Sequence, residues 1–369
     1  MQSVEERPEL RALQKRLYRL TIQDQLLSRR PSAAGPRYAR RAQTVDALWE
    51  SAPFPEHQDA MPVPSFEAGS IDYATFVEAT GGYRGPVVIR GFGAETAAVR
   101  AWTPGSLVER LGDALCTVVE MDEVAMTQPH SSGRILHQMP FSEFIHRMED
   151  EPLYLHNSTE FVQQCPELME ELSLQSINAA FTDPSSTWDE LFSTNLFIGG
   201  ERVFSNLHCA PGGNFFLQIA GGKRWTLVAP ELSPYLFPIL SRPFNHCLSV
   251  YGSYRKHAHA KEDCALFRLP RFTVDLAPGD LLYNPPWWWH EVENTGATIG
   301  CAIRHLPSPL SASPTWQNHP LFSALSVYPQ LWALSAWNYL RHQVRGDGGS
   351  MRAFINPRLA SELNRARSR

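Results

Sequence analysis

The chain has 369 residues, 43% of them hydrophobic, and includes 10 tryptophans. This composition excludes a disordered or fibrous protein and supplies enough apolar material for one packed core. A formal net charge of −5 argues against a general binder of polyanions, so we expect no nucleic-acid partner.

The N-terminus and the cysteines indicate the compartment. The opening sequence MQSVEERPELRALQKRL lacks the apolar stretch of a secretory signal, and the six cysteines include no C-x-x-C pair. No segment approaches the ~18 consecutive apolar residues of a membrane-spanning helix. We therefore expect a cytoplasmic protein in a reducing environment, without a membrane partner.

Residues 1–50 are predicted to form an N-terminal helical segment. Leucines recur at helical spacing between Pro8 and Ser28, with Arg and Lys between them, which is typical of an amphipathic helix. The stretch 29–41, RRPSAAGPRYARR, contains Pro and Gly and is interpreted as a connector. We interpret the local excess of basic residues as a solvated helix face.

Residues 51–308 are predicted to form one domain, with a barrel core at about 150–306. Between 194 and 306 the sequence shows repeated strand and turn signals with almost no helical period, which favours an all-β barrel or sandwich. The elements predicted before the barrel are strands at 85–92, 115–121 and 152–157 and helices at 103–112 and 140–150.

Residues 309–369 are predicted to form a C-terminal helical region. The segment 321–344 is rich in Leu, Ala and Trp at helical spacing and is interrupted only at Pro329. Helices this apolar at the end of a chain bury against the core or against a partner subunit. A homodimer formed through these helices is one of the two interpretations.

The strongest local motif lies in the segment LAPGDLLYNPPWWWHEVENTG. Gly279, Pro285, His290 and Asn294 match the second cupin motif, G-x5-P-x4-H-x3-N. The physical sense of this spacing is a turn into a strand, a bend stiffened by proline, and a further strand whose histidine faces the inside of a barrel.

A second motif occupies residues 193–230. It contains a hydroxyl at Ser205, the triplet His208-Cys209-Ala210, the triplet Asn214-Phe215-Phe216 and the run Gly221-Gly222-Lys223-Arg224-Trp225. Together the two motifs resemble the JmjC or cupin-8 group of Fe(II)/2-oxoglutarate oxygenases, particularly the asparaginyl hydroxylase type that inhibits hypoxia-inducible factor. The resemblance implies a mainly β fold, the double-stranded β-helix of the cupin/JmjC jelly roll, with helices before and after it.

The same resemblance implies a set of cofactor-binding residues. His208 and His290 correspond to the two histidines that bind Fe(II), and imidazole suits this metal. Lys223 corresponds to the lysine that pairs with the distal carboxylate of 2-oxoglutarate. The remaining residues that the resemblance assigns to the cosubstrate pocket are Ser205, Tyr154, Asn214 and Arg304, of which Arg304 stands about where the family often has Asn.

Ala210 departs from the family pattern. The family has a third metal ligand, Asp, two residues after the first histidine, because side chains two apart on a strand face the same way. Alanine cannot bind a metal. The 2-oxoglutarate-dependent halogenases have H-x-A or H-x-G at this place to admit halide, and HCA is similar.

Three interpretations of Ala210 follow. The preferred one is a halogenase with chloride at the open position. The second is a hydroxylase, with water there or with a carboxylate from Glu160, Glu262, Asp263 or Glu291, although Glu291 adjoins His290 and should point outward. The third is a non-catalytic binding module.

The predicted reaction is therefore the oxidative decarboxylation of 2-oxoglutarate to succinate, coupled to functionalisation of an unactivated C–H bond. The substrate is expected to be a small molecule, an amino acid or a peptide, and fold analogy does not choose among them. Two features beside the site are interpreted as packing: Cys209, which points to the opposite face of its strand, and the tryptophans at 287–289, of which one or two should lie inside.

Overall fold

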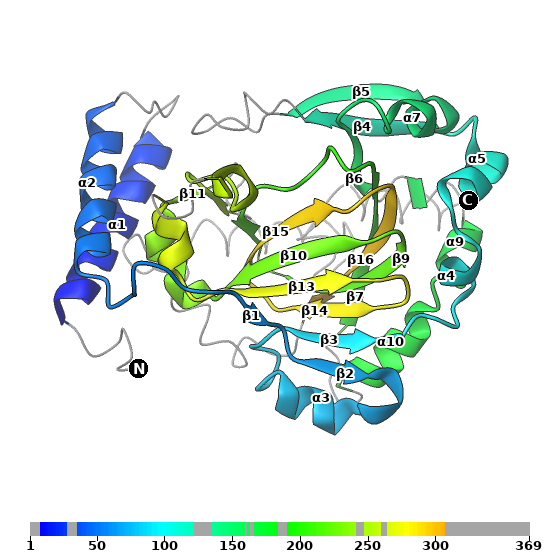
Figure 1. Ribbon diagram of the computed structural model, residues 1–369, viewed down its shortest axis with the longest axis horizontal. Helices are drawn as coiled ribbons and strands as arrows, with labels where there is room; N and C mark the ends of the chain where they lie inside the picture. Colours follow the sequence, from blue (N-terminus) through cyan, green and yellow to red (C-terminus); the bar gives the residue numbers. More distant parts are fainter. Residues whose placement is uncertain are drawn as a thin grey trace, which may run out of the picture. The chain divides into compact units, whose positions relative to one another are not determined.

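The computed structural model describes residues 8–27, 35–121, 134–158, 161–162, 166–183, 190–210, 212–240, 247–259 and 264–306. Two sheets form the body of this part of the chain (Figure 1). One contains, in spatial order, β1 (Met61–Pro62), β13 (Phe272–Leu276), β10 (Lys223–Val228), β15 (Trp289–Asn294), β8 (His208–Cys209), β12 (Cys247–Ser249) and β11 (Pro238–Leu240). The other contains β2 (Ser65–Glu67), β3 (Val87–Arg90), β14 (Leu281–Asn284), β9 (Gly213–Ala220), β16 (Thr298–Leu306), β7 (Glu190–Gly199), β6 (Leu153–Ser158), β4 (Leu115–Met121) and β5 (Arg134–Pro140).

Successive strands change sheets along the chain. Strands β7 to β10 alternate between the two sheets, and β13 to β16 do so again. The strand pairs in the middle of both sheets are antiparallel, for example β15 with β10 and with β8. This winding is that of a double-stranded β-helix, so the expected mainly β jelly-roll fold is confirmed.

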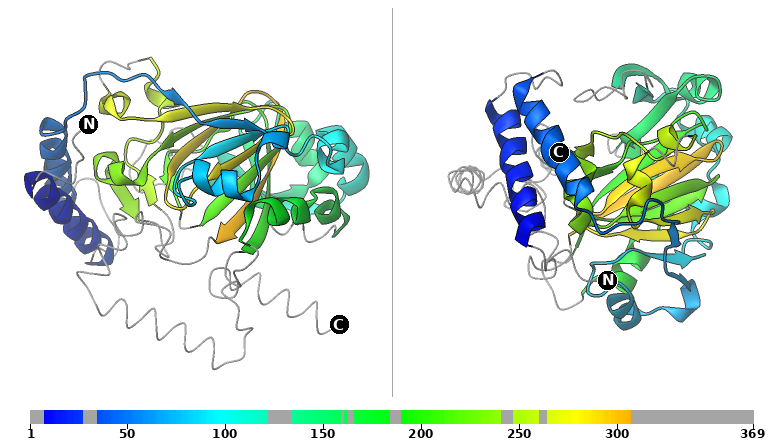
Figure 2. Two further views of the ribbon diagram at one scale, coloured as in Figure 1. Left: turned by 90° about the horizontal axis from the view of Figure 1, so that it is seen from below. Right: turned by 60° about the vertical axis from the view of Figure 1, so that its left-hand side comes forward.

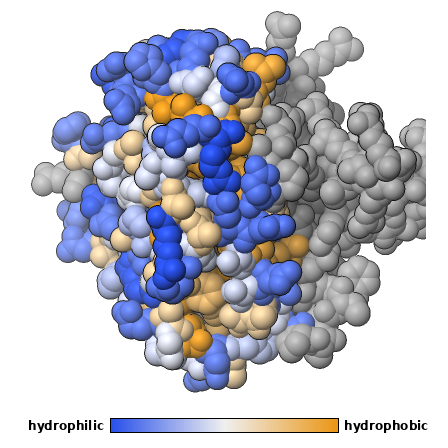
Figure 3. All heavy atoms as spheres, turned by 90° about the vertical axis from the view of Figure 1, so that its right-hand side faces the viewer, coloured by the Kyte–Doolittle hydropathy of each residue, from blue (hydrophilic) through white to orange (hydrophobic). Residues whose placement is uncertain are grey.

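Alternate side chains of the nine-stranded sheet point to opposite faces and so contribute to two separate hydrophobic cores. Residues such as Phe216, Trp225, Leu282 and Ala302 fill the space between the sheets. Their chain neighbours, such as Phe215 on β9, point to the other face of the nine-stranded sheet. The helices around that second core are α3 (Tyr73–Ala79), α4 (Ala97–Ala101), α5 (Pro104–Leu111), α7 (Phe141–Arg147), α9 (Pro166–Glu171) and α10 (Leu174–Phe181). Figure 3 shows the face that carries α4, α5 and α9, on which hydrophilic side chains predominate.

The turn before β14 illustrates why the motif that runs from Gly279 to Asn294 folds as it does. Gly279 has a positive φ of 92°, and a Cβ atom there would lie 3.1 Å from the Cα atom of Ala94. Asp280 accepts hydrogen bonds from the backbone N–H groups of Ala277 and Gly91 and pairs with Arg90 at 2.6 Å. Glycine and aspartate therefore join this turn to β3 and set where β14 begins.

Two N-terminal helices, α1 (Pro8–Leu27) and α2 (Pro36–Glu50), pack together at the end of the seven-stranded sheet where β11 lies (Figure 2). Arg41 of α2 pairs with Asp24 of α1 at 2.8 Å, with both side chains buried, and also donates to the carbonyl oxygen of Pro238. The predicted first helix is present. The interpretation of 29–41 as a connector is wrong from Pro36 on, because proline is well tolerated in the first turn of a helix.

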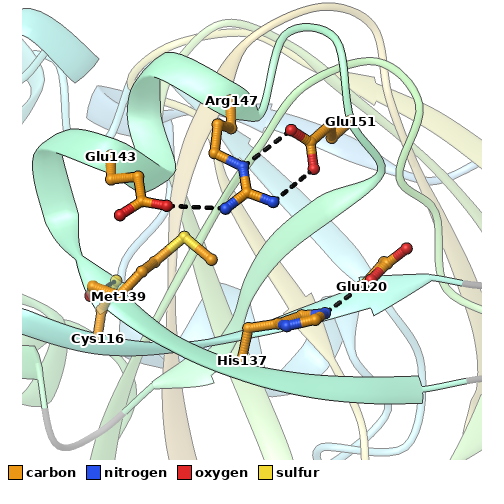
Figure 4. A network of polar contacts seen from close by, with 7 residues as sticks. All are labelled: Cys116, Glu120, His137, Met139, Glu143, Arg147 and Glu151. Atoms are coloured by element: carbon orange, nitrogen blue, oxygen red, sulfur yellow. Dashed lines mark hydrogen bonds and ion pairs between the residues drawn. The ribbon is translucent and has the colours of Figure 1, made fainter.

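Helix α7 and the hairpin of β4 and β5 carry a network of charged side chains (Figure 4). Arg147 pairs with Glu143 and with Glu151, in each case at 2.8 Å, and His137 lies 2.6 Å from Glu120. Glu143 lies one turn before Arg147 within α7, so this pair supports the helix, whereas Glu151 lies beyond the helix end and its pair ties that end to the turn before β6.

The remaining short helices are 3-10 turns: η2 (Ala68–Ser70), η3 (Pro230–Leu236), η4 (Arg255–His257) and η6 (Ala265–Arg268). In the described part of the chain, no helix has both the length and the apolar character needed to cross a membrane. The predicted C-terminal helical region at 309–369, with its dimerisation alternative, lies outside the described residues.

Candidate metal and cosubstrate site

Two histidines from different strands meet inside the barrel. His208 on β8 and His290 on β15 are direct partners in the antiparallel register, and their ring centres are 4.2 Å apart. Metal–nitrogen bonds of about 2.1 Å at adjacent coordination positions place two imidazole centres roughly 4–5 Å apart. The spacing therefore suits two ligands of a single metal ion.

The hydrogen bonds of both rings suit metal binding as well. His208 Nδ1 lies 2.8 Å from the carbonyl oxygen of Asn206, and His290 Nδ1 lies 2.9 Å from that of Trp288. Because a carbonyl oxygen only accepts, Nδ1 carries the proton in each ring and the lone pair is on Nε2. Donation of the second ring nitrogen to a carbonyl is the usual way in which proteins orient metal-binding histidines.

The environment of His290 keeps its imidazole neutral. The residue is 5% exposed, and the indole of Trp225 stacks on its ring at 5.4 Å. Burial, reinforced by the positive charge of Arg304, lowers the pKa of His290 to about 4. The neutral ring is the form that binds metal ions.

Ala210 directly follows β8, and its carbonyl oxygen accepts a hydrogen bond of 2.8 Å from the backbone N–H of Trp287. This bond joins the first histidine's segment to the loop that precedes the second. Among the residues that the structure describes, no cluster of three or more His, Cys, Asp and Glu side chains is arranged to hold a metal ion. The histidine pair is thus present without a described carboxylate beside it.

The carboxylates considered as substitutes divide into two groups. Glu160, Glu262 and Asp263 lie outside the described residues. Glu291 is 1% exposed and accepts a hydrogen bond of 2.7 Å from the backbone N–H of Tyr254, on the face of β15 opposite to His290. It points away from the histidine pair, as its position in the strand indicates.

Lys223, the first residue of β10, is buried between the sheets with 1% of its surface exposed. Its Nζ atom lies 2.5 Å from Oδ1 of Asn294 and 3.5 Å from the hydroxyl oxygen of Tyr154. Burial lowers the pKa of Lys223 to about 7. A buried ammonium group whose described partners are neutral is suited to an anionic ligand.

Two glycines make room for this lysine. A Cβ atom at Gly300 would lie 2.4 Å from the ring of Phe216 and 3.3 Å from Cε of Lys223. One at Gly199 would lie 2.8 Å from the ring of Tyr154 and 3.4 Å from Nδ2 of Asn294, the two residues whose side chains contact Lys223. The sequence motifs do not indicate these glycines or the contact of Asn294 with Lys223. Asn294 was named only as part of the cupin motif, and the glycine clearances depend on strand pairing that the sequence does not show.

Three polar residues form a row across neighbouring strands. In register, Asn284 of β14 lies beside Asn214 of β9, which lies beside Arg304 of β16. Nδ2 of Asn284 is 3.2 Å from Nδ1 of His290, so the row reaches the histidine pair. Among the described residues, none provides a hydrogen-bond partner for the buried Oδ1 of Asn214, which marks a place for a donor from a ligand.

Ser205 lies beside β15, at a point along the strand between His290 and the register partner of Lys223. Its hydroxyl oxygen accepts a hydrogen bond of 2.9 Å from the N–H of Val292, and its own N–H donates to the carbonyl oxygen of Val292 at 2.8 Å. The hydroxyl proton can still be donated to a ligand. Every residue that the sequence analysis assigned to the site is therefore found on or beside the strands that line the barrel.

The features interpreted as packing are buried. Cys209 is 0% exposed and is the register partner of Cys247 on β12. Trp287, Trp288 and Trp289 are all 7% exposed or less. Trp288 joins the core between the sheets, while the indole N–H of Trp289 donates to Oγ of Ser233.

Comparison with known proteins gives a consistent picture. The model of the family described as "Cupin-like domain" matches residues 74–306. The chain is 26% identical to "tRNA wybutosine-synthesizing protein 5" of Danio rerio over 276 residues, covering 68% of this chain and 78% of that protein. The Gallus gallus protein of the same name is also 26% identical, with 68% and 80% covered. "HSPB1-associated protein 1" of Homo sapiens is 32% identical over 103 residues, 27% of this chain and 21% of that protein.

The family match spans the described barrel, from α3 to the end of β16, and both histidines lie within it. The motifs, the winding of the strands and this match all agree. The chain belongs to the cupin-like family.

Proposed function

We propose that this protein is a JmjC-type oxygenase that uses Fe(II) and 2-oxoglutarate to functionalise a C–H bond. The observation that carries the proposal is the pairing of His208 with His290, with rings 4.2 Å apart and both Nδ1 atoms facing backbone carbonyls. Neutral imidazoles suit Fe(II), and the enclosed position between two sheets suits a reaction from which water is excluded.

The cosubstrate is assigned to the space between the histidine pair and Lys223. The ammonium group of Lys223 binds the distal carboxylate, and the hydroxyls of Tyr154 and Ser205 donate to it. Asn214 lines the end of the pocket nearer the histidines. When bound, iron and 2-oxoglutarate supply the activation of dioxygen and the electrons released as 2-oxoglutarate becomes succinate. The protein's own part is to orient the cosubstrate and to hold it in one position.

The outcome at the substrate depends on what binds beside Ala210. A methyl group there leaves room for an exogenous ligand, and we propose halide, which makes the protein a halogenase. Support comes from the alanine itself and from the position of Glu291, which faces away from the histidines. Hydroxylation is the alternative outcome, in which water takes this place or an undescribed carboxylate completes the metal site.

The proposal is tested by anaerobic reconstitution with Fe(II) and 2-oxoglutarate. We expect a charge-transfer absorption band in the visible range, which shifts when chloride is replaced by bromide. His208→Ala should abolish the band, whereas His57→Ala, at a histidine with 44% of its side chain exposed, serves as the matched control and should retain it.

Absence of the band in the unmodified protein would overturn the proposal in favour of a non-catalytic binding module. A band that does not respond to halide would instead favour hydroxylation over halogenation. Product analysis by mass spectrometry then distinguishes a halogen from an oxygen atom in the product.

A further inference from the structure

Two positive side chains point into the barrel. Lys223 points inward, and so does Arg304, which shares its face of β16 with the core residue Ala302. Strands β8, β9, β10, β14 and β16 contain no Asp or Glu. The acidic residues of β13 and β15 are Asp275, Glu291 and Glu293.

These three carboxylates all lie on the outer face of their sheet. Asp275 pairs with Arg224 at 2.7 Å, Glu291 accepts a hydrogen bond from Tyr254, and Glu293 lies 3.9 Å from Arg255. None of the carboxylates on β8, β9, β10, β13, β14, β15 and β16 faces Lys223 or Arg304, and position 210 carries alanine. An anionic ligand can therefore supply the negative charge that these two cations lack on those strands.

The two inward cations lie at different places. Lys223 passes over Gly300, and Arg304 is four residues farther along the same strand, which corresponds to about 13 Å. In the proposed function, 2-oxoglutarate uses one end at Lys223 and the other at the metal. Neither end of the cosubstrate is then assigned to Arg304, although the family resemblance implies a place for this residue in the cosubstrate pocket.

The surroundings of Arg304 suit a ligand that arrives from solvent. The side chain is partly exposed, and its Nη2 atom donates to Oδ1 of Asn157 on β6 at 3.1 Å. This amide is neutral, and a guanidinium group has five N–H donors. Burial lowers the pKa of Arg304 to about 10, so the group is still charged at neutral pH. Arg304 is the register partner of Asn214, which lies beside Asn284, and the side chain of Asn284 lies 3.2 Å from Nδ1 of His290. The row of these residues therefore leads from Arg304 toward the histidine pair.

We propose that Arg304 binds an anionic group of the substrate, a carboxylate or a phosphate, and so holds the substrate with its reacting carbon toward the histidine pair. This inference rests on the proposed function and names the substrate class. A planar guanidinium matches either group with two parallel hydrogen bonds, which fixes orientation as well as affinity.

The test uses isothermal titration of the full chain in the presence of 2-oxoglutarate and Mn(II). The probes are propionate for a carboxylate and methyl phosphate for a phosphate. The variants are Arg304→Gln, which removes the charge, and Arg304→Lys, which retains charge but not the planar pair of donors. Arg224→Gln, on the outer face of β10, is the matched control.

We expect one of the two probes to bind the unmodified protein, and to bind Arg304→Gln about tenfold more weakly. The affinity of Arg304→Lys for this probe should lie between these two values, and the affinity of Arg224→Gln should equal that of the unmodified protein. The dissociation constant of 2-oxoglutarate, titrated separately, should stay within about twofold in all three variants. If Arg304→Gln shows no thermal unfolding transition and is therefore unfolded, the inference is tested by comparing Arg304→Lys with the unmodified protein.

Two results would overturn the inference. If each probe binds the Arg304 variants with the same affinity as it binds the unmodified protein, no anion subsite exists at Arg304. A loss of 2-oxoglutarate affinity in Arg304→Gln as large as that in Lys223→Met would assign Arg304 to the cosubstrate. Failure of the unmodified protein to bind 2-oxoglutarate would instead reject the proposed function, and the probe titrations without it would still report on Arg304.

Discussion

Lys223 shows how a single buried side chain links pH to ligand binding. In the free protein, burial lowers its pKa to about 7, while its hydrogen-bond partners Asn294 and Tyr154 are neutral. A bound dicarboxylate favours the charged form of the lysine. Binding above about pH 7 therefore requires uptake of a proton.

The resulting prediction concerns the affinity for 2-oxoglutarate. We expect the affinity to be constant below about pH 7 and to fall by about tenfold per pH unit above it, because the neutral lysine must first be protonated. Isothermal titration between pH 6 and 9 measures this. Lys223→Met should bind far more weakly at every pH, whereas Lys15→Met, on the exposed face of α1, should follow the unmodified protein. An affinity independent of pH would show that Lys223 does not contact the ligand.

A second prediction concerns Ala210→Asp. Residues two apart on a strand face the same way, so a carboxylate at 210 should join His208 and His290 as a third ligand. We expect tighter Fe(II) binding, by about tenfold or more in competition with a chelator, and a shift of products toward hydroxylation. Ala210→Leu adds bulk without a ligand and serves as the control. Equal metal affinities of the two variants would argue against an open coordination position at this residue.

At the scale of elements, one buried ion pair joins the two N-terminal helices to each other and, through Arg41, to the barrel, in addition to their apolar packing. Arg41 is 0% exposed and joins Asp24 of α1 to Pro238 at the start of β11. Removal of one partner leaves the other charge buried and unpaired. The ion pair therefore holds α1 and α2 on the barrel only as long as both partners are present.

We expect Arg41→Ala to lower the free energy of unfolding by about 3–5 kcal/mol, measured by urea denaturation. The double variant Arg41→Met with Asp24→Leu should recover most of this loss, because it removes both charges and keeps the volume filled. Arg40→Ala, at an exposed position on the same helix, should change stability by no more than about 0.5 kcal/mol. A double variant as unstable as Arg41→Ala would show that packing of the guanidinium, and not its charge, matters.

At the scale of the whole molecule, the expectation that no nucleic acid is bound stays a prediction. The described part of α1 exposes Arg11, Lys15, Arg16 and Arg19, which we interpret as a solvated face. Relatives of the chain bear the name of a tRNA-modifying protein, so the expectation needs a direct test.

We expect no shift of tRNA in gel electrophoresis at about 0.15 M salt, since the formal net charge of the chain is −5. The comparison variant reverses two charges, Arg16→Glu and Arg19→Glu. A complex formed by the unmodified protein and lost in this variant would show that the basic face of α1 is a binding surface.

Much of this molecule follows from local sequence. The helix from Pro8, the helix after Thr103 and the strand Leu115–Met121 have recognisable local patterns, in the second case with Thr103 as the N-cap, and the structure contains all three close to the predicted bounds. The histidines and the lysine stand out because the spacing of their motifs follows from side chains alternating across strands. Such signals depend on neighbours in the chain and can be recognised without the fold.

Other features depend on contacts between distant segments, and only the tertiary structure decided them. β8 contains two residues, too few for any period, so its pairing with β15 and the meeting of the two histidines come from the sheet. The clearance at Gly300, the contact of Asn294 with Lys223 and the outward position of the carboxylates arise in the same way. Local sequence determined which residues have the right chemistry, whereas packing between strands decided which of them share one cavity, because burial and cross-strand register are properties of the whole fold.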